Sequence, residues 1–320
     1  MQSLRDLRRK ILTPNISETK LDVRGFHVKD DESKEMLENV GASFLAGYGF
    51  AAEAATTEAA ERRLETLPTR FRGFAYEGAG MGFAVRDALR PGRPRHVRSL
   101  LSGRGDAHVY MIYVGVGWAM ARVPRIRWGQ LHAPDPLLRW LVLDGYGFHQ
   151  AYFHTDRYVR GQYRHENFPW PADGPRGYAA RVIDQGVGRA MWFVGGTDAD
   201  VVSDLIAAFP AHRRADLYAG AGLAATYAGG VTEAELRRFR ERAGDHRIDL
   251  AQGSAFAAGA RVRAGLVVPH NEIATQVFCG VTPAEAAKVT DVTLPAEGDG
   301  DVPAFERWRR AIAAEFEAWC

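Results

Sequence analysis

A short pattern of small and bulky residues recurs seven times along the chain and organises its apolar positions. Each copy has a glycine, one residue, a second small residue, a bulky side chain and then mostly alanines, as in LAGYGFAAEA and YAGAGLAATY. The leading glycines lie 31, 37, 30, 41, 34 and 33 residues apart, at Gly47, Gly78, Gly115, Gly145, Gly186, Gly220 and Gly253. The average spacing of about 34 residues is the length of a two-helix repeat.

Glycine weakens a helix, so two glycines at fixed places must gain something from the missing side chains. We expect the small residues of each copy to form one face into which another backbone packs closely, with the glycines lining a common side. Gly47 to Ala52 and Gly220 to Ala225 also fit the G-x-G-x-x-A pattern of a dinucleotide-binding loop. That interpretation requires one such loop after a strand, and here seven copies occur, none after an obvious strand.

Segments between the copies carry helix start and stop signals. The first glycine-bearing helix is predicted over 34–55, and partner helices are predicted over 57–67, 95–102, 198–209 and 232–243. The sequence therefore predicts an all-α protein of about seven tandem two-helix repeats, stacked as a solenoid or a closed α/α toroid.

Composition divides the chain into three expected parts. An N-terminal helix and an extended lead-in occupy 1–33, a helical-repeat body occupies 34–296, and a capping helix occupies 297–320. The body carries an insertion at 153–177 whose aromatic and polar composition suits a covering loop. The apolar stripes of the terminal helices are Leu4, Leu7 and Ile11 at the start and Phe305, Trp308, Ile312 and Phe316 at the end.

Composition and charge exclude several classes of protein. Apolar residues make up 46%, charged residues 25%, and the net charge is +2, so nothing favours nucleic acid as a partner. Two cysteines suit a reducing compartment. No secretion signal is visible, and the longest nearly apolar run, Val109 to Ala121, is too short to span a bilayer. We expect a cytoplasmic protein that is not an integral membrane protein.

An arginine recurs six residues before the leading glycine in four copies, at Arg72, Arg139, Arg214 and Arg247. We expect these arginines to bond carbonyls or acids of the neighbouring repeat, for instance Asp216 and Asp249.

Because equivalent positions line one surface in a repeat protein, residues that break their own column are the candidates for chemistry. Glu77 and Asp144 precede leading glycines where three of the other copies have alanine or valine and two have glutamine. His149 stands in a column of alanine and glycine, and Arg189 in a column of large apolar residues. Asp144, His149, Glu77 and Arg189 are therefore the predicted catalytic residues, since a buried acid near a histidine and an arginine supports acid–base work. The alternative is an internal hydrogen-bond network that ties repeats together.

Further residues in or beside the glycine-bearing copies are predicted to bind substrate: Trp118, Phe148, Tyr152, Asp184, Gln185, Trp192 and Gln252. A metal site at His149, His154, His165 and Glu166 is weakly supported because their spacing fits no helical ligand pair. No phosphate-binding or nucleophile motif occurs. We expect no metal and no cofactor.

Segments such as FAYEGAGMGFAV, DPLLRWLVLDGYGFHQAYF and LAQGSAFAAGARVRAG resemble the bacterial UnbL-like family of unknown function, over nearly the whole chain. That family is found beside enediyne polyketide synthases and in other specialised-metabolite clusters. The resemblance implies a cytoplasmic role in natural-product biosynthesis, and it carries no catalytic residues across.

Three functions stay open. The protein could hold an apolar polyene intermediate in a helical-repeat cavity, with or without transforming it. It could be a non-canonical terpene or polyene cyclase, with a buried acid supplying a proton and aromatic walls stabilising cationic character. It could also be a non-catalytic scaffold for synthase partners.

Overall fold

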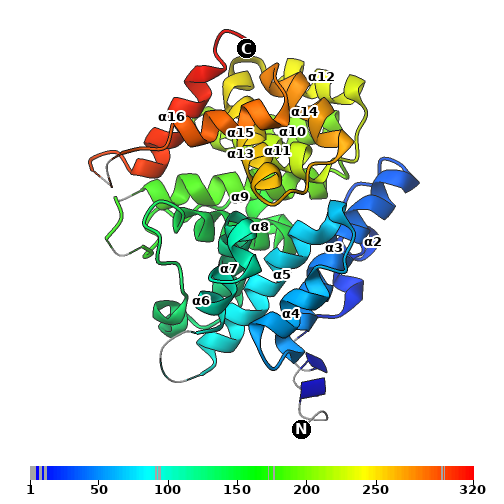
Figure 1. Cartoon of the computed structure of the whole chain (residues 1–320). Helices are drawn as coiled ribbons and strands as arrows, with labels where there is room; N and C mark the ends of the chain where they lie inside the picture. The colour runs from blue at the N-terminus through cyan, green and yellow to red at the C-terminus, as the bar shows by residue number, and fades with distance from the viewer. Residues whose placement is uncertain are drawn as a thin grey trace. The chain divides into compact units, whose positions relative to one another are not determined.

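The computed structural model describes residues 5, 6, 9, 10, 13–90, 92, 95–171, 173–175, 177–296, 298 and 300–320, and every regular element in these residues is helical (Figure 1). The predicted all-α class is confirmed. The expected N-terminal stripe of Leu4, Leu7 and Ile11 lies outside the described residues.

The chain divides into two compact units. Unit 1 consists of 1–25 and 38–146, and unit 2 consists of 26–37 and 147–320. Helices of the first half are α2 (Leu21–Arg24), α3 (Asp31–Glu53), α4 (Thr57–Leu64), α5 (Thr69–Ala88), α6 (His96–Leu101), α7 (Val109–Arg122) and α8 (Trp140–Phe153), with 3₁₀ turns at Ile16–Thr19, Arg104–His108 and Arg125–Gln130. Helices of the second half are α9 (Tyr178–Val194), α10 (Ala199–Ala207), α11 (Ala211–Ala228), α12 (Glu233–Ala243), α13 (Arg247–Arg263), α14 (Pro269–Cys279), α15 (Pro283–Val292) and α16 (Ala304–Glu315), with a π turn at Asp156–Arg160 and a 3₁₀ turn at Gly244–His246.

Within unit 2 the helices form two rows. The glycine-bearing helices α9, α11 and α13 pack consecutively and α15 follows them, while α10, α12 and α14 pack consecutively as the second row. Unit 1 has the same kind of pairing, since α5 packs on α7 and the short helices α4 and α6 pack on α5 and on each other. Helix pairs thus stack within each unit, as the repeat period predicts.

The two glycines of a copy contact different neighbours, which corrects the expected single glycine face. A Cβ on Gly115 of α7 would collide with the carbonyl of Glu77 on α5, and one on Gly117 would collide with the carbonyl of Val142 on α8. Gly220 and Gly222 of α11 face α9 and α13 in the same way. Residues two apart on a helix point in nearly opposite directions, at about 100° per residue. The first glycine therefore packs against the preceding glycine-bearing helix, and the second packs against the following one.

The arginine column caps helices. Arg72 donates to the carbonyl of Leu67 just beyond α4, Arg214 to the carbonyls of Ala207 and Phe209 after α10, and Arg247 to the carbonyl of Arg240 in α12. The carbonyls at a helix C-terminus lack helical partners, and each arginine satisfies those of the helix before its own. Carbonyl bonding was expected, whereas Asp216 bonds other arginines.

Two segments that were expected to be an extended lead-in and a covering loop are more ordered than that expectation. The lead-in before α3 contains a 3₁₀ turn and the one-turn helix α2, and α3 begins at Asp31 rather than at 34. In the insertion at 153–177, Tyr158 and Val159 are buried, and the Tyr158 hydroxyl lies within hydrogen-bond distance of Gln150 and His165.

The last helix packs against α13 and α15. Its apolar stripe of Phe305, Trp308, Ile312 and Phe316 is buried, and Trp308 Nε1 donates to the carbonyl of Thr290 (2.8 Å).

Candidate functional site

Two predicted site residues of unit 1 bond each other. Glu77 on α5 is buried, and its Oε1 accepts a hydrogen bond from Trp118 Nε1 on α7 (3.0 Å). The two residues stand one position before and three positions after the leading glycines of neighbouring copies. This contact satisfies one carboxyl oxygen and the indole donor at the packed surface between two glycine-bearing helices.

The other three predicted catalytic residues fall in different units. Asp144 is buried in unit 1, and His149 and Arg189 are buried in unit 2. The His149 ring lies 4.7 Å from the Phe153 ring, and the Arg189 guanidinium carbon lies 4.9 Å from the centre of the Phe148 ring. Arg189 thus makes a cation–π contact with a residue predicted to bind substrate.

The aromatic residues of unit 2 that were predicted to bind substrate belong to two separate clusters. Phe148 and Tyr152 stack at 5.9 Å, and Phe148 meets Phe193 edge-on at 5.2 Å. Trp192 belongs elsewhere, because its ring lies 5.5 Å from Phe239 and its Nε1 donates to the carbonyl of Gly229 (3.0 Å). The structure therefore joins Phe148 with Tyr152 and places Trp192 in another part of the core.

The polar residues predicted to bind substrate have arginine partners in two cases. Both carboxyl oxygens of Asp184 accept from Arg213, at 2.9 and 2.6 Å, and Gln252 Oε1 accepts from Arg309 Nε (3.0 Å). Burial raises the pKa of Asp184, and the hydrogen bonds and charge of Arg213 oppose that rise. Because both oxygens accept from a charged guanidinium, the pair holds the ionised carboxylate. Buried Gln185 has no partner for Nε2 among the residues that the structure describes.

A buried ion network in unit 2 was missed by the column comparison. Asp216 accepts from Arg181 (2.9 and 3.1 Å) and from Arg309 (2.8 Å), and Glu306 accepts from both arginines (2.7 and 3.2 Å). Tyr178 adds a hydroxyl donor to Glu306 (3.1 Å). Comparing equivalent positions between the copies could not reveal this network, because Glu306 and Arg309 lie on the C-terminal helix, outside the repeats that could be aligned.

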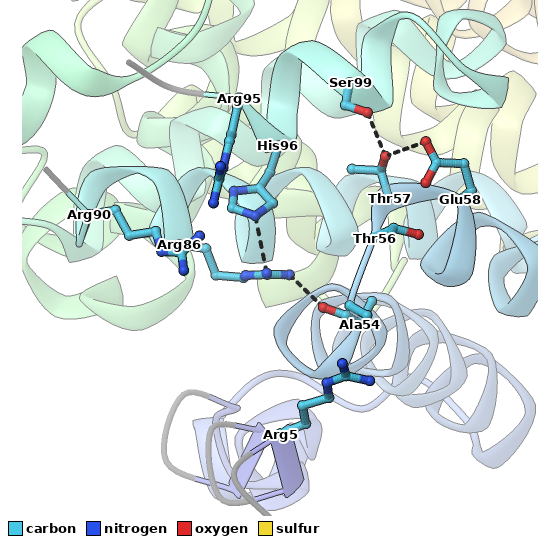
Figure 2. A pocket seen from close by; sticks show the side chains of 11 residues that line it. Arg5, Ala54, Thr56, Thr57, Glu58, Arg86, Arg90, Arg95, His96 and Ser99 are labelled. Atoms are coloured by element: carbon cyan, nitrogen blue, oxygen red, sulfur yellow. Dashed lines mark hydrogen bonds between the residues drawn. The ribbon is translucent and has the colours of Figure 1, made fainter. Parts of the chain in front are cut away.

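A pocket of about 570 Å³ opens in unit 1, lined by Arg5, Ala54, Ala55, Thr56, Thr57, Glu58, Arg86, Arg90, Arg95, His96 and Ser99 (Figure 2). Its lining has four arginines against one glutamate. The residues come from the N-terminal segment, the junction of α3 and α4, the C-terminal end of α5 and the start of α6. None of them was a predicted site residue, although the run RDALRPGRPRHVR at 86–98 holds five arginines.

Local hydrogen bonds fix the floor of this pocket. Arg86 Nη1 donates to the carbonyls of Ala51 and Ala54 (2.6 and 3.1 Å), which end α3. Asp87 accepts from the backbone N–H groups of His96 and Val97 at the start of α6. One arginine thus caps a C-terminus and one aspartate caps an N-terminus, as the helix dipoles favour.

The histidine between these two side chains has a fixed tautomer. His96 Nδ1 lies 2.5 Å from Asp87 Oδ1, and Arg86 Nη2 lies 3.1 Å from His96 Nε2. The carboxylate can only accept and the guanidinium can only donate, so Nδ1 carries the proton and His96 is neutral. Burial disfavours the charged form of Asp87, but the hydrogen bonds from His96 and from two backbone N–H groups lower its pKa overall. Positive charge in the pocket therefore comes from the arginines.

The arginines at the mouth have unused donors. The side chains of Arg5, Arg90 and Arg95 bond no other described residue, and Arg90 and Arg95 are exposed. Guanidinium groups that converge from separate segments on one pocket suit an anionic ligand.

Two further findings bear on ligands and membranes. In the part of the chain that the structure describes, no group of three or more histidine, cysteine, aspartate or glutamate residues is placed to hold a metal ion. No helix among the described residues is long and apolar enough to cross a bilayer.

Fold and pocket together define an all-helical protein of stacked helix pairs with a basic pocket in one unit. The chain belongs to a family of proteins of unknown function, DUF1702, whose model matches residues 3–316. No curated protein and no solved structure matches it.

Proposed function

We propose that this protein takes part in bacterial natural-product biosynthesis and holds an apolar polyene intermediate without transforming it. The resemblance to the UnbL-like family supports the biosynthetic setting. The observation that carries the preference for holding is the bonding of two predicted site acids, Glu77 to Trp118 and Asp184 to Arg213. Acids engaged in this way serve the fold, and proton donation would require these bonds to break.

The proposed contact for such a ligand is the buried cluster of Phe148, Tyr152 and Phe193 in unit 2. These rings supply large rigid contact area, which suits a conjugated chain. Synthase enzymes are proposed partners because an intermediate must be received and passed on.

Cyclisation is the second candidate, favoured by the contact of Arg189 with Phe148. An aromatic face that already stabilises one cation could stabilise a carbocationic intermediate. Asp144, the predicted acid of the column comparison, would then be the residue to test.

Recovery of the ligand distinguishes these functions. The protein is purified from a producing strain, and its organic extract is analysed by mass spectrometry and absorbance for a conjugated polyene. We expect unchanged polyene with the parent and much less with Phe148→Leu. The matched control is Phe239→Leu, in the other aromatic cluster, which should retain the polyene if both variants fold.

Product titre in a complemented deletion strain tests catalysis. Asp144→Ala should fold and support full titre if the protein only holds its ligand. Loss of titre with retained polyene would identify a cyclase instead. Co-purification of a synthase without any polyene would identify a scaffold.

A further inference from the structure

We propose that the basic pocket of unit 1 binds the dianionic phosphate of a small phosphate monoester. This site is independent of the polyene-binding function, because the pocket shares no residue with the aromatic cluster of unit 2. No predicted site residue lines it.

Charge identifies the ligand as an anion. Among the described residues, four arginines and one glutamate line the pocket, and His96 is neutral, so this part of the lining has an excess of three positive charges. In unit 2, Arg181, Arg213 and Arg309 each bond buried carboxylates. Arg5, Arg90 and Arg95 have no such acid among the described residues. An external anion would complete the same pairing.

The geometry favours phosphate over a single carboxylate. Arg86, Arg90, Arg95 and the N-terminal Arg5 all line this pocket, and Figure 2 shows their side chains coming from different segments of the chain. A phosphate monoester presents three oxygens and nearly two negative charges at neutral pH, so it can accept from several guanidinium forks at once. A carboxylate offers two oxygens and one charge.

The volume of the pocket and the polar residues away from its arginines favour a small molecule as the ligand. A volume of about 570 Å³ lies within the range of ligand sites and exceeds what one phosphate needs. Away from the arginines lie Thr57, Ser99 and Glu58, with Thr57 Oγ1 2.6 Å from Ser99 Oγ and 3.3 Å from Glu58 Oε1 (Figure 2). The hydrogen bond of Thr56, together with that of the Glu58 backbone, lowers the pKa of the Glu58 carboxyl. This end can accept a hydroxyl or amine donor from the rest of the ligand.

Arg86 is a positioning residue in this proposal. Its bonds to the end of α3 and to His96 hold one guanidinium in a fixed place in the pocket. Preorganised donors reduce the ordering cost of binding.

The experiment is a calorimetric titration of the full chain at low ionic strength and a pH of about 8, where phosphate is mostly dianionic. The probes are methyl phosphate, inorganic phosphate, dimethyl phosphate and acetate. We expect methyl phosphate and inorganic phosphate to bind about tenfold more tightly than the two monoanions, since they carry the second charge. A preference for dimethyl phosphate or for acetate would overturn the monoester assignment.

Variants locate the binding. Arg90→Ala and Arg95→Ala should each weaken methyl phosphate binding by about tenfold. The matched control Arg127→Ala removes an exposed arginine of unit 1 that does not line the pocket, and should leave the affinity unchanged. Equal affinities for all three variants, or no heat with any phosphate probe, would show that the pocket is not the site.

Glu58→Gln gives a result of opposite sign. Removing this acid, the one carboxylate among the described lining residues, should strengthen methyl phosphate binding roughly twofold to fivefold, because one repulsive charge is lost in a solvated pocket. Weaker binding in this variant would contradict the electrostatic basis of the proposal. Circular dichroism of each variant checks that it is folded.

Discussion

Three arginines of unit 2 and the three arginines at the mouth of the unit 1 pocket differ in whether an acid of the chain bonds them. In unit 2, Arg181, Arg213 and Arg309 bond Asp216, Asp184 and Glu306, and these acids are buried. In unit 1, the arginines at the mouth of the pocket are exposed or half-buried and have no acid partner among the described residues.

The difference separates structural arginines from arginines available to a ligand. A buried charge must be paired, so every partner in unit 2 is needed for stability. An arginine at the surface is already solvated, so it contributes little to the free energy of unfolding. Its donors are therefore available to an external anion. The following predictions test this contrast, from the largest expected effect to the smallest.

Close helix packing at glycines stabilises each of the two units. Gly115→Leu in unit 1 and Gly220→Leu in unit 2 should each lower the free energy of unfolding by several kcal/mol, because the new side chain would enter a neighbouring backbone. Urea denaturation measures this. Gly129→Ala is the control, since a Cβ there meets no atom within 4 Å. Parent-like stability of either leucine variant would refute the close approach.

Removing an acid from unit 2 should be the next most harmful change. Asp216→Ala leaves Arg181 and Arg309 without one of their acceptors and should cost about 3–5 kcal/mol, as for other broken buried ion pairs. Glu241→Ala, at an exposed position on α12, is the comparison and should change stability by less than about 0.5 kcal/mol. Similar melts for both variants would show that the network contributes no more than surface charges do.

The ion network should also make stability depend on pH. Burial disfavours the Glu306 carboxylate, but the charges and hydrogen bonds of the surrounding arginines lower its pKa below the ordinary value of 4.5. A lowered folded pKa contributes stability above pH 4.5, and this contribution is lost as the pH falls through the folded pKa. Glu306→Gln should therefore flatten the loss of stability below pH 4.5, measured by urea denaturation across that range. An unchanged slope would mean that other groups carry the acid sensitivity.

The pocket arginines should have the smallest effect on stability. Without phosphate, Arg90→Ala and Arg95→Ala should each change the free energy of unfolding by less than about 0.5 kcal/mol. Thermal melts with and without methyl phosphate then compare each variant with the parent. A large destabilisation in the absence of phosphate would place these arginines with the structural set of unit 2.

The extent of sequence prediction differs between the fold and the site. Glycine spacing and the caps of the partner helices predict the helix pairs, and α12 forms over Glu233–Ala243 with Thr232 as its N-cap, close to the predicted 232–243. The column breaks identified Glu77 as an unusual buried acid, but its partner Trp118 lies 41 residues away. The basic run at 86–98 is visible in the sequence, yet its convergence with Arg5 and the start of α4 is not.

What the sequence by itself determined is the periodic part of the structure: helices, their ends and the small residues that permit close packing. These features follow from backbone bonds and side-chain repeats within one or two turns, so they are local in the chain. The tertiary structure alone decided which charges are paired, because Arg309 meets Asp216 across 93 residues and through a helix outside the repeats. It likewise decided that a glycine pair serves two opposite neighbours, since the sequence shows only that close approach is possible on that helix.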